Sequence, residues 1–258
     1  MDLGLAGRVV LVTGGSRGLG RAAVDVLAAE GARVVVSGRS RTALEAVVAA
    51  HGSGAVEPVV CDNADPDAPA RLLAAARARW GGLDAALVSV GGPPAGPVSR
   101  AGGGTPVSDE QWSAAFGSVF LGAVRMGREL GPELPAGGSL AFVLSTSVKA
   151  PLTDLAISNG LRPGLAMVAK TLADELGPHG VRVNALLPGR VATERVTELD
   201  EATGDPQQAR DRALRAIPLG RYGEPAEFGR VAAFLLSPAA SFVSGAVLPV
   251  DGGMLRAL

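Results

Sequence analysis

The chain has 258 residues, of which 47% are hydrophobic and only 3% aromatic, and its formal net charge is −1. A chain this close to neutrality gives no electrostatic reason to expect nucleic acid or an anionic membrane surface as a partner. Its single cysteine, Cys61, excludes an internal disulfide and suits a reducing, cytoplasmic compartment.

The first residues, Met1 to Gly4, lack the basic and then apolar order of a signal peptide. No run of about 18 apolar residues is free of charge, so no membrane span is expected. The two histidines, His51 and His179, are far apart in the sequence and do not suggest a metal site.

Short Val-rich runs recur along the chain and alternate with Ala- and Leu-rich segments of helical length. Runs that stay apolar without alternation are typical of strands buried on both faces, and helices between them imply right-handed crossovers. We therefore predict an α/β fold, in which residues 1–258 form a single Rossmann-type domain. Its sheet should be doubly wound, parallel and seven-stranded, with helices on both faces. The expected strands are Arg8–Val12, Arg33–Val36, Val56–Val60, Ala85–Val88, Ser139–Leu144, Val181–Leu186 and Ala246–Val250.

Two segments between these elements are expected to shape the pocket for a small-molecule substrate. Gly91 to Thr105, rich in Gly and Pro, follows the fourth strand and is predicted to be a loop. The polar stretch from Glu194 to Arg215 lies between the sixth strand and the last helix. We expect it to form a mobile lid or substrate loop over residues 190–216.

A glycine-rich segment separates the first strand from the first helix, with the spacing Gly-x-x-x-Gly-x-Gly. Glycines let the backbone turn tightly and approach a pyrophosphate, and the helix N-terminus offers it unpaired N–H groups. This context favours a dinucleotide site over the alternative, a plain βα turn. The expected cofactor contacts in the segment are Gly14, Ser16, Arg17, Gly18, Leu19 and Gly20.

The end of the second strand bears on the choice of cofactor. A dinucleotide fold that prefers NAD(H) places an acidic residue there to hold the ribose 2′-hydroxyl. This chain has Gly38 and Arg39 instead, and Arg17 points to the same region. Two guanidiniums without a carboxylate favour the 2′-phosphate of NADP(H); two solvated surface arginines are the alternative. Asp62, after the third strand, is expected to meet the adenine ring or to cap a helix.

With these motifs the chain resembles the short-chain dehydrogenase/reductase family almost from end to end. The segment Thr13–Gly20 resembles the family's cofactor loop, and Asp62 resembles its adenine contact. The segment Val183–Gly189 resembles its nicotinamide-side loop. Further matches are Pro218–Arg221 with Gly223 and Pro225, and Val250–Gly253. The resemblance implies a nicotinamide cofactor, a homo-oligomer that is a tetramer or a dimer, and further cofactor contacts at Pro188, Gly189, Val191 and Thr193.

The family's catalytic positions match poorly. Its members usually carry Asn, Ser and a Tyr-x-x-x-Lys pair. The serine falls on Ser145, but the tyrosine position holds Ser158, the lysine position Arg162 and the asparagine position Val119. In the family's mechanism the tyrosine protonates the developing alkoxide, with its pKa lowered by the adjacent ammonium.

These substitutions change what the expected site can do. Ser158 is far less acidic than tyrosine, although it can donate a hydrogen bond. Arg162 can hold the nicotinamide ribose and supply positive charge, but it cannot relay a proton. Lys149 is an alternative proton donor if an apolar pocket lowers its pKa; otherwise it is a solvated loop residue. Ser145, at the carboxyl end of a strand, is the expected substrate contact.

Three further residues have open roles. Tyr222, the only tyrosine, is expected to pack or cap before a helix rather than react. Arg190 either binds an anionic substrate group or lies on the surface, and His179 is expected in a turn.

A proline at position 163 constrains the helix that carries Arg162. Since proline is tolerated in the first turn of a helix, we predict that this helix begins near Ser158 to Pro163. Ser158 then has two competing interpretations, helix cap and catalyst. Under either, Arg162 should point into the cofactor crevice.

Three functions follow from these residues. The first is an NADP(H)-dependent oxidoreductase that reduces a carbonyl or oxidises an alcohol with an unusual acid. The second is a non-redox enzyme, such as a dehydratase, isomerase or cyclase, because fold does not determine chemistry. The third is a catalytically silent, cofactor-binding partner in an assembly. The intact cofactor loop and Ser145 favour the first, and the loss of the Tyr-x-x-x-Lys pair favours the other two.

Overall fold

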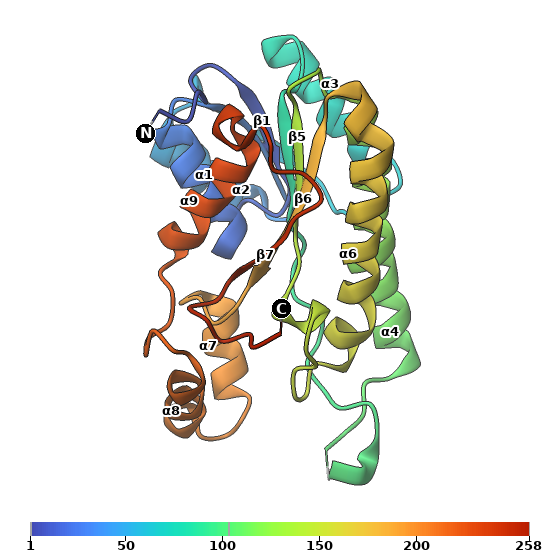
Figure 1. The fold of residues 1–258 in the computed structure, drawn as a ribbon, viewed down its shortest axis with the longest axis vertical. Coiled ribbons are helices and arrows are strands. Elements are labelled where there is room, and N and C mark those ends of the chain that lie inside the picture. Colours follow the sequence, from blue (N-terminus) through green and yellow to red (C-terminus); the bar gives the residue numbers. More distant parts are fainter. Residues whose placement is uncertain (1, 103, 258) are drawn as a thin grey trace.

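Seven parallel strands form one sheet at the centre of this computed structural model, which describes residues 2–102 and 104–257 (Figure 1). Met1, Gly103 and Leu258, which belong to the predicted domain and, for Gly103, to the predicted loop, lie outside the described residues. The strand order is β3-β2-β1-β4-β5-β6-β7, so the predicted doubly wound fold is confirmed. The strands are β1 (Val9–Val12), β2 (Arg33–Gly38), β3 (Val56–Val60), β4 (Ala85–Val88), β5 (Ser139–Val143), β6 (Arg182–Pro188) and β7 (Val247–Val250).

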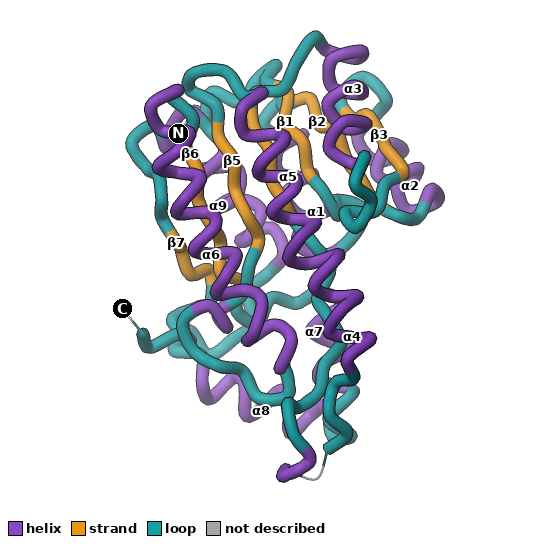
Figure 2. Tube along the Cα trace, turned by 90° about the vertical axis from the view of Figure 1, so that its right-hand side faces the viewer, coloured by secondary structure: helices purple, strands orange, loops and turns teal. Residues whose placement is uncertain are grey.

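Helices cover both faces of the sheet (Figures 1 and 2). One face packs against α1 (Gly18–Ala29), α2 (Arg41–His51) and α9 (Pro225–Leu236). The other packs against α3 (Ala68–Trp80), α5 (Gly122–Leu130) and α6 (Ala156–Leu176), with α4 (Asp109–Ala115) leading into α5 through a π-helical segment, Phe116–Leu121. Two more helices, α7 (Glu194–Glu201) and α8 (Pro206–Ala216), follow β6.

Small residues allow the helices to approach one another closely. A Cβ atom at Gly229 of α9 would lie 2.5 Å from the carbonyl oxygen of Ala22 in α1. A Cβ at Gly160 of α6 would lie 2.8 Å from the Trp112 ring. Because a core with few aromatics gains its contacts through close approach, the Ala- and Gly-rich composition suits this packing. None of the helices among the described residues has the length and apolarity needed to cross a membrane.

The start of α6 differs from our prediction. The helix begins at Ala156, and Pro163 is its eighth residue rather than a member of the first turn. Ser158 lies within the helix, and the cap position belongs to Leu155. The Asn159 side chain explains this early start, because its Oδ1 accepts from the Leu152 N–H at 2.9 Å and its Nδ2 donates to the Leu152 carbonyl at 2.8 Å. Tertiary contacts of α6 thus outweigh the one backbone hydrogen bond that Pro163 removes.

The predicted lid segment is helical. Helices α7 and α8 occupy residues 194–216 almost completely and lie together at one end of the molecule (Figure 1). Asp200 connects them to the body of the protein, since its Oδ1 accepts from Arg190 at 2.6 Å and its Oδ2 from the Tyr222 hydroxyl at 2.9 Å. Residues 91–102 and 104–105 form a loop with one short 3₁₀ turn, as predicted.

Candidate active site

The glycine-rich segment between β1 and α1 has a backbone that side chains would not permit. Gly14 and Gly18 have φ values of +59° and +56°. A Cβ at Gly15 would lie 2.5 Å from the Val36 side chain, and one at Gly20 would lie 2.3 Å from the Gly14 carbonyl oxygen. Arg17 occupies the N-cap position of α1 without a side-chain cap bond, so the first N–H groups of the helix stay open to a ligand. This shape fits a pyrophosphate.

The end of β4 holds this loop in place. Thr13 Oγ1 donates to the Ser89 carbonyl at 2.7 Å and accepts from the Ser89 N–H at 2.9 Å. A Cβ at Gly14 would lie 2.8 Å from the same carbonyl oxygen. Strands β1 and β4 are neighbours at the point where the strand order reverses, which is where open α/β sheets bind ligands. The glycine loop therefore lies at the switch point.

At the adenosine end, the loop meets the end of β2. A Cβ at Gly38 would lie 2.7 Å from Ser16 Oγ, so the two segments are in contact. Arg39 is exposed, and the Arg17 side chain, 67% exposed, lies 4.0 Å from the Glu194 carboxylate. Asp62 Oδ1 accepts from the Ala64 N–H at 3.0 Å in a turn, and α3 begins only at Ala68. The helix-cap interpretation of Asp62 is therefore wrong.

The nicotinamide-side loop rests on the last strand. The Gly189 N–H donates to the Val250 carbonyl at 3.0 Å, and a Cβ at Gly189 would lie 2.6 Å from the Asp251 Cβ. This close approach explains the glycine that follows Pro188, the last residue of β6. Val191 is buried and forms an isolated bridge with Gly223. Thr193 is the extended N-cap residue of α7, and its hydroxyl does not cap the helix.

Three serines gather at the carboxyl end of β5. Ser145 Oγ accepts from the Ser147 N–H at 3.1 Å, and its own hydroxyl proton has no acceptor among the described residues. Ser147 Oγ lies 3.0 Å from Ser158 Oγ and 3.3 Å from the Ser158 carbonyl. Ser158 is only 5% exposed. Ser145, half-buried, is thus the member of the cluster whose proton is free for a ligand.

Arg162 lies beneath this cluster and is 4% exposed, so it is not turned to bulk solvent. Its Nη1 donates to the Val143 carbonyl at 2.6 Å and to the Leu144 carbonyl at 3.0 Å, the two peptide groups before Ser145. Its Nε is buried without a partner, and no carboxylate of a described residue lies within salt-bridge distance. Burial lowers the pKa of the guanidinium to about 10, so the group stays a cation at neutral pH.

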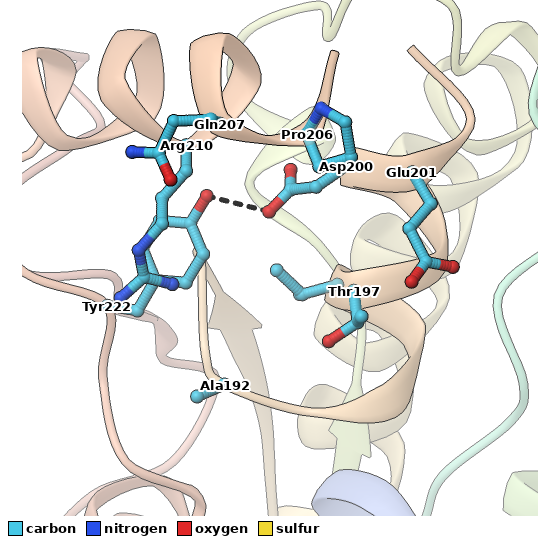
Figure 3. A pocket seen from close by; sticks show the side chains of 9 residues that line it. Ala192, Thr197, Asp200, Glu201, Pro206, Gln207, Arg210 and Tyr222 are labelled. Carbon is cyan, nitrogen blue, oxygen red and sulfur yellow. Dashed lines mark hydrogen bonds between the residues drawn. The ribbon is translucent and has the colours of Figure 1, made fainter. Parts of the chain in front are cut away.

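The other candidate residues are exposed, bonded to protein groups or placed in a turn. Lys149 is exposed, which favours the solvated interpretation. Arg190 pairs with Asp200 and so has a protein partner rather than a free guanidinium. The Tyr222 hydroxyl also bonds Asp200, in a pocket of about 250 Å³ between α7 and α8 (Figure 3). Burial, and then the bond to Asp200, raise the pKa of Tyr222, which makes it a poorer acid. His179 lies in a 3₁₀ turn, as predicted.

Sequence reasoning missed three residues that shape this region. Asp200 is a buried carboxylate, 7% exposed, that holds α7 to the body of the protein. Asn159 fixes the segment after Ser145. Arg195 of α7 reaches the Pro93 carbonyl at 2.7 Å, on the loop after β4. Each contact joins polar groups on separate loops or helices, for which the sequence carries no periodic signal; only the position of Arg195, next to the nicotinamide-side loop, was a hint.

Comparisons with known proteins find relatives along nearly the whole chain. A family model described as enoyl-(acyl carrier protein) reductase matches residues 14–255. The 2,5-dichloro-2,5-cyclohexadiene-1,4-diol dehydrogenase of Sphingobium indicum is 34% identical over 254 residues, which is 96% of this chain and 97% of that protein. The 3-oxoacyl-(acyl-carrier-protein) reductase of Thermotoga maritima is 30% identical over 255 residues, 97% of this chain and 99% of that protein.

Solved structures are similar along the whole chain. The L-sorbose reductase of Gluconobacter frateurii, crystallised with NADPH and L-sorbose, is 29% identical with a TM-score of 0.91, and the match covers 100% of both chains. A short-chain dehydrogenase/reductase of Brucella melitensis is also 29% identical, with a TM-score of 0.90 and complete coverage of both chains.

Proposed function

This chain belongs to the short-chain dehydrogenase/reductase family of oxidoreductases, and we propose that it interconverts a carbonyl and an alcohol on a small organic or acyl substrate with NADP(H). We propose that it does so as a single Rossmann-type domain with a degenerate catalytic tetrad. The observation that carries the proposal is the glycine loop, whose contacts leave no space for side chains at Gly14, Gly15 and Gly20. A loop without side chains at these positions lets a dinucleotide pyrophosphate approach its backbone N–H groups closely.

The preference for NADP(H) over NAD(H) is supported by charge. Arg17 and Arg39 stand at the adenosine end, and the end of β2 carries no carboxylate. A guanidinium forms short, charge-assisted bonds with a phosphate, which an NAD(H) ribose lacks. The similar L-sorbose reductase was crystallised with NADPH. In this proposal Asp62 contacts the adenine, and Pro188, Gly189, Val191 and Thr193 form the nicotinamide side.

The proposed reaction relies on Ser145 and Arg162 in place of a tyrosine acid. The bound cofactor would supply or accept the hydride. Ser145 would donate its free hydroxyl proton as a hydrogen bond to the substrate oxygen. Arg162, unneutralised and buried, would stabilise the negative charge that develops on that oxygen, because a fixed charge acts strongly where water is excluded. Water at the mouth of the crevice would then provide the proton. Lys149 is an alternative donor from the rim of the site.

Arg162 has a second proposed task. Its Nη1 is occupied by strand carbonyls, whereas its Nη2 donates to no described residue. A ribose hydroxyl is a suitable acceptor for such an unpaired N–H. In this proposal Arg162 therefore holds the nicotinamide ribose, and Ser158 supports the site through Ser147.

One observation favours a second candidate, a dehydratase, isomerase or cyclase. The Ser158 hydroxyl is bonded to Ser147 and buried, so the tyrosine position provides no acid for redox chemistry. A silent, cofactor-binding partner fits the same observation. Absorbance at 340 nm during turnover tests the redox proposal against both. If no carbonyl or alcohol substrate changes that absorbance, a substrate screen by mass spectrometry separates the non-redox enzyme from the silent partner.

We also propose that the protein is a homo-oligomer. Phe242 is fully exposed, and Met167, Phe116 and Leu121 expose large apolar surfaces on α6 and the π-helical segment. Large apolar side chains that a protein exposes favour contact with another protein surface. Analytical ultracentrifugation of the protein and of a Phe242→Ser variant tests this proposal.

A further inference from the structure

Arg195, in the first turn of α7, joins two segments that are 102 residues apart in the chain. Its Nη2 donates to the Pro93 carbonyl at 2.7 Å. The guanidinium lies over Gly92, where a Cβ atom would be 2.8 Å from Nε and 3.4 Å from Cζ. A side chain at position 92 would push the guanidinium away, so the missing side chain is what makes the contact possible.

The neighbouring residue places α7 against the other side of the same crevice. The Glu194 carboxylate lies 4.0 Å from the Arg17 guanidinium, in the glycine loop. Glu194 and Arg195 thus connect the first turn of α7 to both loops that border the switch point between β1 and β4. The crevice that would hold a dinucleotide lies beneath this turn.

The hydrogen-bond acceptors of Arg195 are weak ones for an arginine. Apart from the Pro93 carbonyl, the only partner of its guanidinium among the described residues is Glu198 of the same helix, with Nη1 at 3.4 Å from Oε2, and the side chain is 38% exposed. A neutral carbonyl is a weaker acceptor than a phosphate oxygen, to which arginine forms short, charge-assisted bonds. A phosphate that enters the crevice would therefore compete successfully for this guanidinium.

We propose that Arg195 binds the pyrophosphate of the dinucleotide and closes α7 over it. In the free protein the Pro93 carbonyl holds the guanidinium at the crevice, and the phosphate replaces that carbonyl when the cofactor binds. The proposal rests on the proposed function for the class of cofactor, but it does not depend on hydride transfer. It adds a cofactor-binding residue that lies outside the glycine loop and the nicotinamide-side loop.

Calorimetry on the full-length protein tests the assignment with two probes, NADPH and adenosine 2′-monophosphate, which lacks the pyrophosphate. We expect Arg195→Gln to weaken NADPH at least about tenfold and adenosine 2′-monophosphate less than about twofold, since one charge-assisted bond is lost only with the first probe. Arg195→Lys, which keeps the charge, should restore part of the affinity. Arg212→Gln is the matched control, because Arg212 is an exposed arginine of α8 in the same lid.

Stopped-flow kinetics add a second readout through Gly92→Ala, which displaces the guanidinium from its resting place but keeps its charge. Dissociation of NADPH should become faster in Arg195→Gln and stay unchanged in Gly92→Ala. Unchanged NADPH affinity in a folded Arg195→Gln variant overturns the proposal, and so does an equal loss for both probes. Failure of the unaltered protein to bind NADPH at all would instead refute the proposed function.

Discussion

The Ser158 hydroxyl lies 3.0 Å from the Ser147 hydroxyl, inside the protein, at the residue to which the proposed tetrad assigns the tyrosine position. This pair explains why adding the missing phenol should not be enough. We predict that Ser158→Tyr alone gives no robust reduction of simple ketones. Arg162 is held by the carbonyls of Val143 and Leu144 and is not the mobile ammonium that acidifies the phenol, and residues that act as a unit are not additive.

The measurement is NADPH consumption with a panel of ketones, with the unaltered protein as reference. A triple change, Ser158→Tyr with Arg162→Lys and Val119→Asn, is the matched comparison. If the single change performs as well as the triple change, the account of the degenerate tetrad is wrong.

The preference for NADP(H) should depend on Arg39. We predict that Arg39→Ala weakens NADPH roughly ten- to hundredfold and leaves NADH nearly unchanged, because a charge-assisted bond to the 2′-phosphate contributes about 1.5–3 kcal/mol. Calorimetry with both cofactors measures this. Arg33→Ala is the control, since Arg33 is exposed at the opposite end of the same strand. Equal affinity of the unaltered protein for NADPH and NADH would contradict the prediction.

The buried guanidinium of Arg162 should contribute to the affinity for NADPH. We predict that Arg162→Ala weakens NADPH by at least about tenfold, because a guanidinium that holds the ribose contributes about 1.5–3 kcal/mol through its hydrogen bonds. The comparison is Arg182→Ala. Arg182, at the amino end of β6, is also buried, and within the part of the chain that the structure describes it donates only to backbone carbonyls, those of Leu235, Ser237 and Val243. Its loss should lower stability without changing the NADPH affinity of the folded protein. NADPH binding to Arg162→Ala with the parent's affinity would refute the role.

The stability that Glu227 contributes at the start of α9 should depend on pH. Two hydrogen bonds from Arg221, and then one from the Glu224 N–H, lower the pKa of Glu227 from 4.5 to about 2. A carboxylate whose pKa is depressed on folding stabilises the protein above its unfolded pKa, and this contribution is lost as the pH falls through the folded value. We predict that Glu227→Gln has a lower urea midpoint than the parent above pH 5.

The difference between the two urea midpoints should then shrink as the pH falls below the unfolded value and vanish only once the pH has fallen through about 2, because the parent's carboxylate is then protonated as well. Glutamine keeps the acceptor for the Glu224 N–H, so the variant isolates the ion pair with Arg221. A midpoint difference that stays constant down to acidic pH would show that Glu227 contributes through packing rather than charge.

The strands could be predicted because parallel strands buried on both faces leave an uninterrupted apolar signature. β1 and β5 are buried along their whole length, and both were placed to within one residue. The glycine loop could also be predicted, because its backbone geometry excludes side chains at Gly15 and Gly20. Where local chemistry alone determines the structure, the sequence was sufficient.

Side-chain hydrogen bonds between a helix and the loops that flank it could not be predicted. Pro163 suggested a late helix start, but the pairing of Asn159 with Leu152 begins α6 before it. Asp200 looked like one more charge in a polar segment, yet it is buried between Arg190 and Tyr222. In each case a side-chain hydrogen bond to a residue outside the helix outweighed a local preference, and such contacts leave no pattern along the chain.

The packing of Gly189 against Val250 and Asp251 has a consequence for how the protein is made. Synthesis proceeds from the amino end, so the glycine loop emerges from the ribosome long before β7, on which the nicotinamide-side loop packs. The nicotinamide-side loop has no backing until β7 has been synthesised and has paired with β6. Premature termination just before β7 would therefore spare every glycine of the cofactor loop and still leave Gly189 without its contacts to Val250 and Asp251.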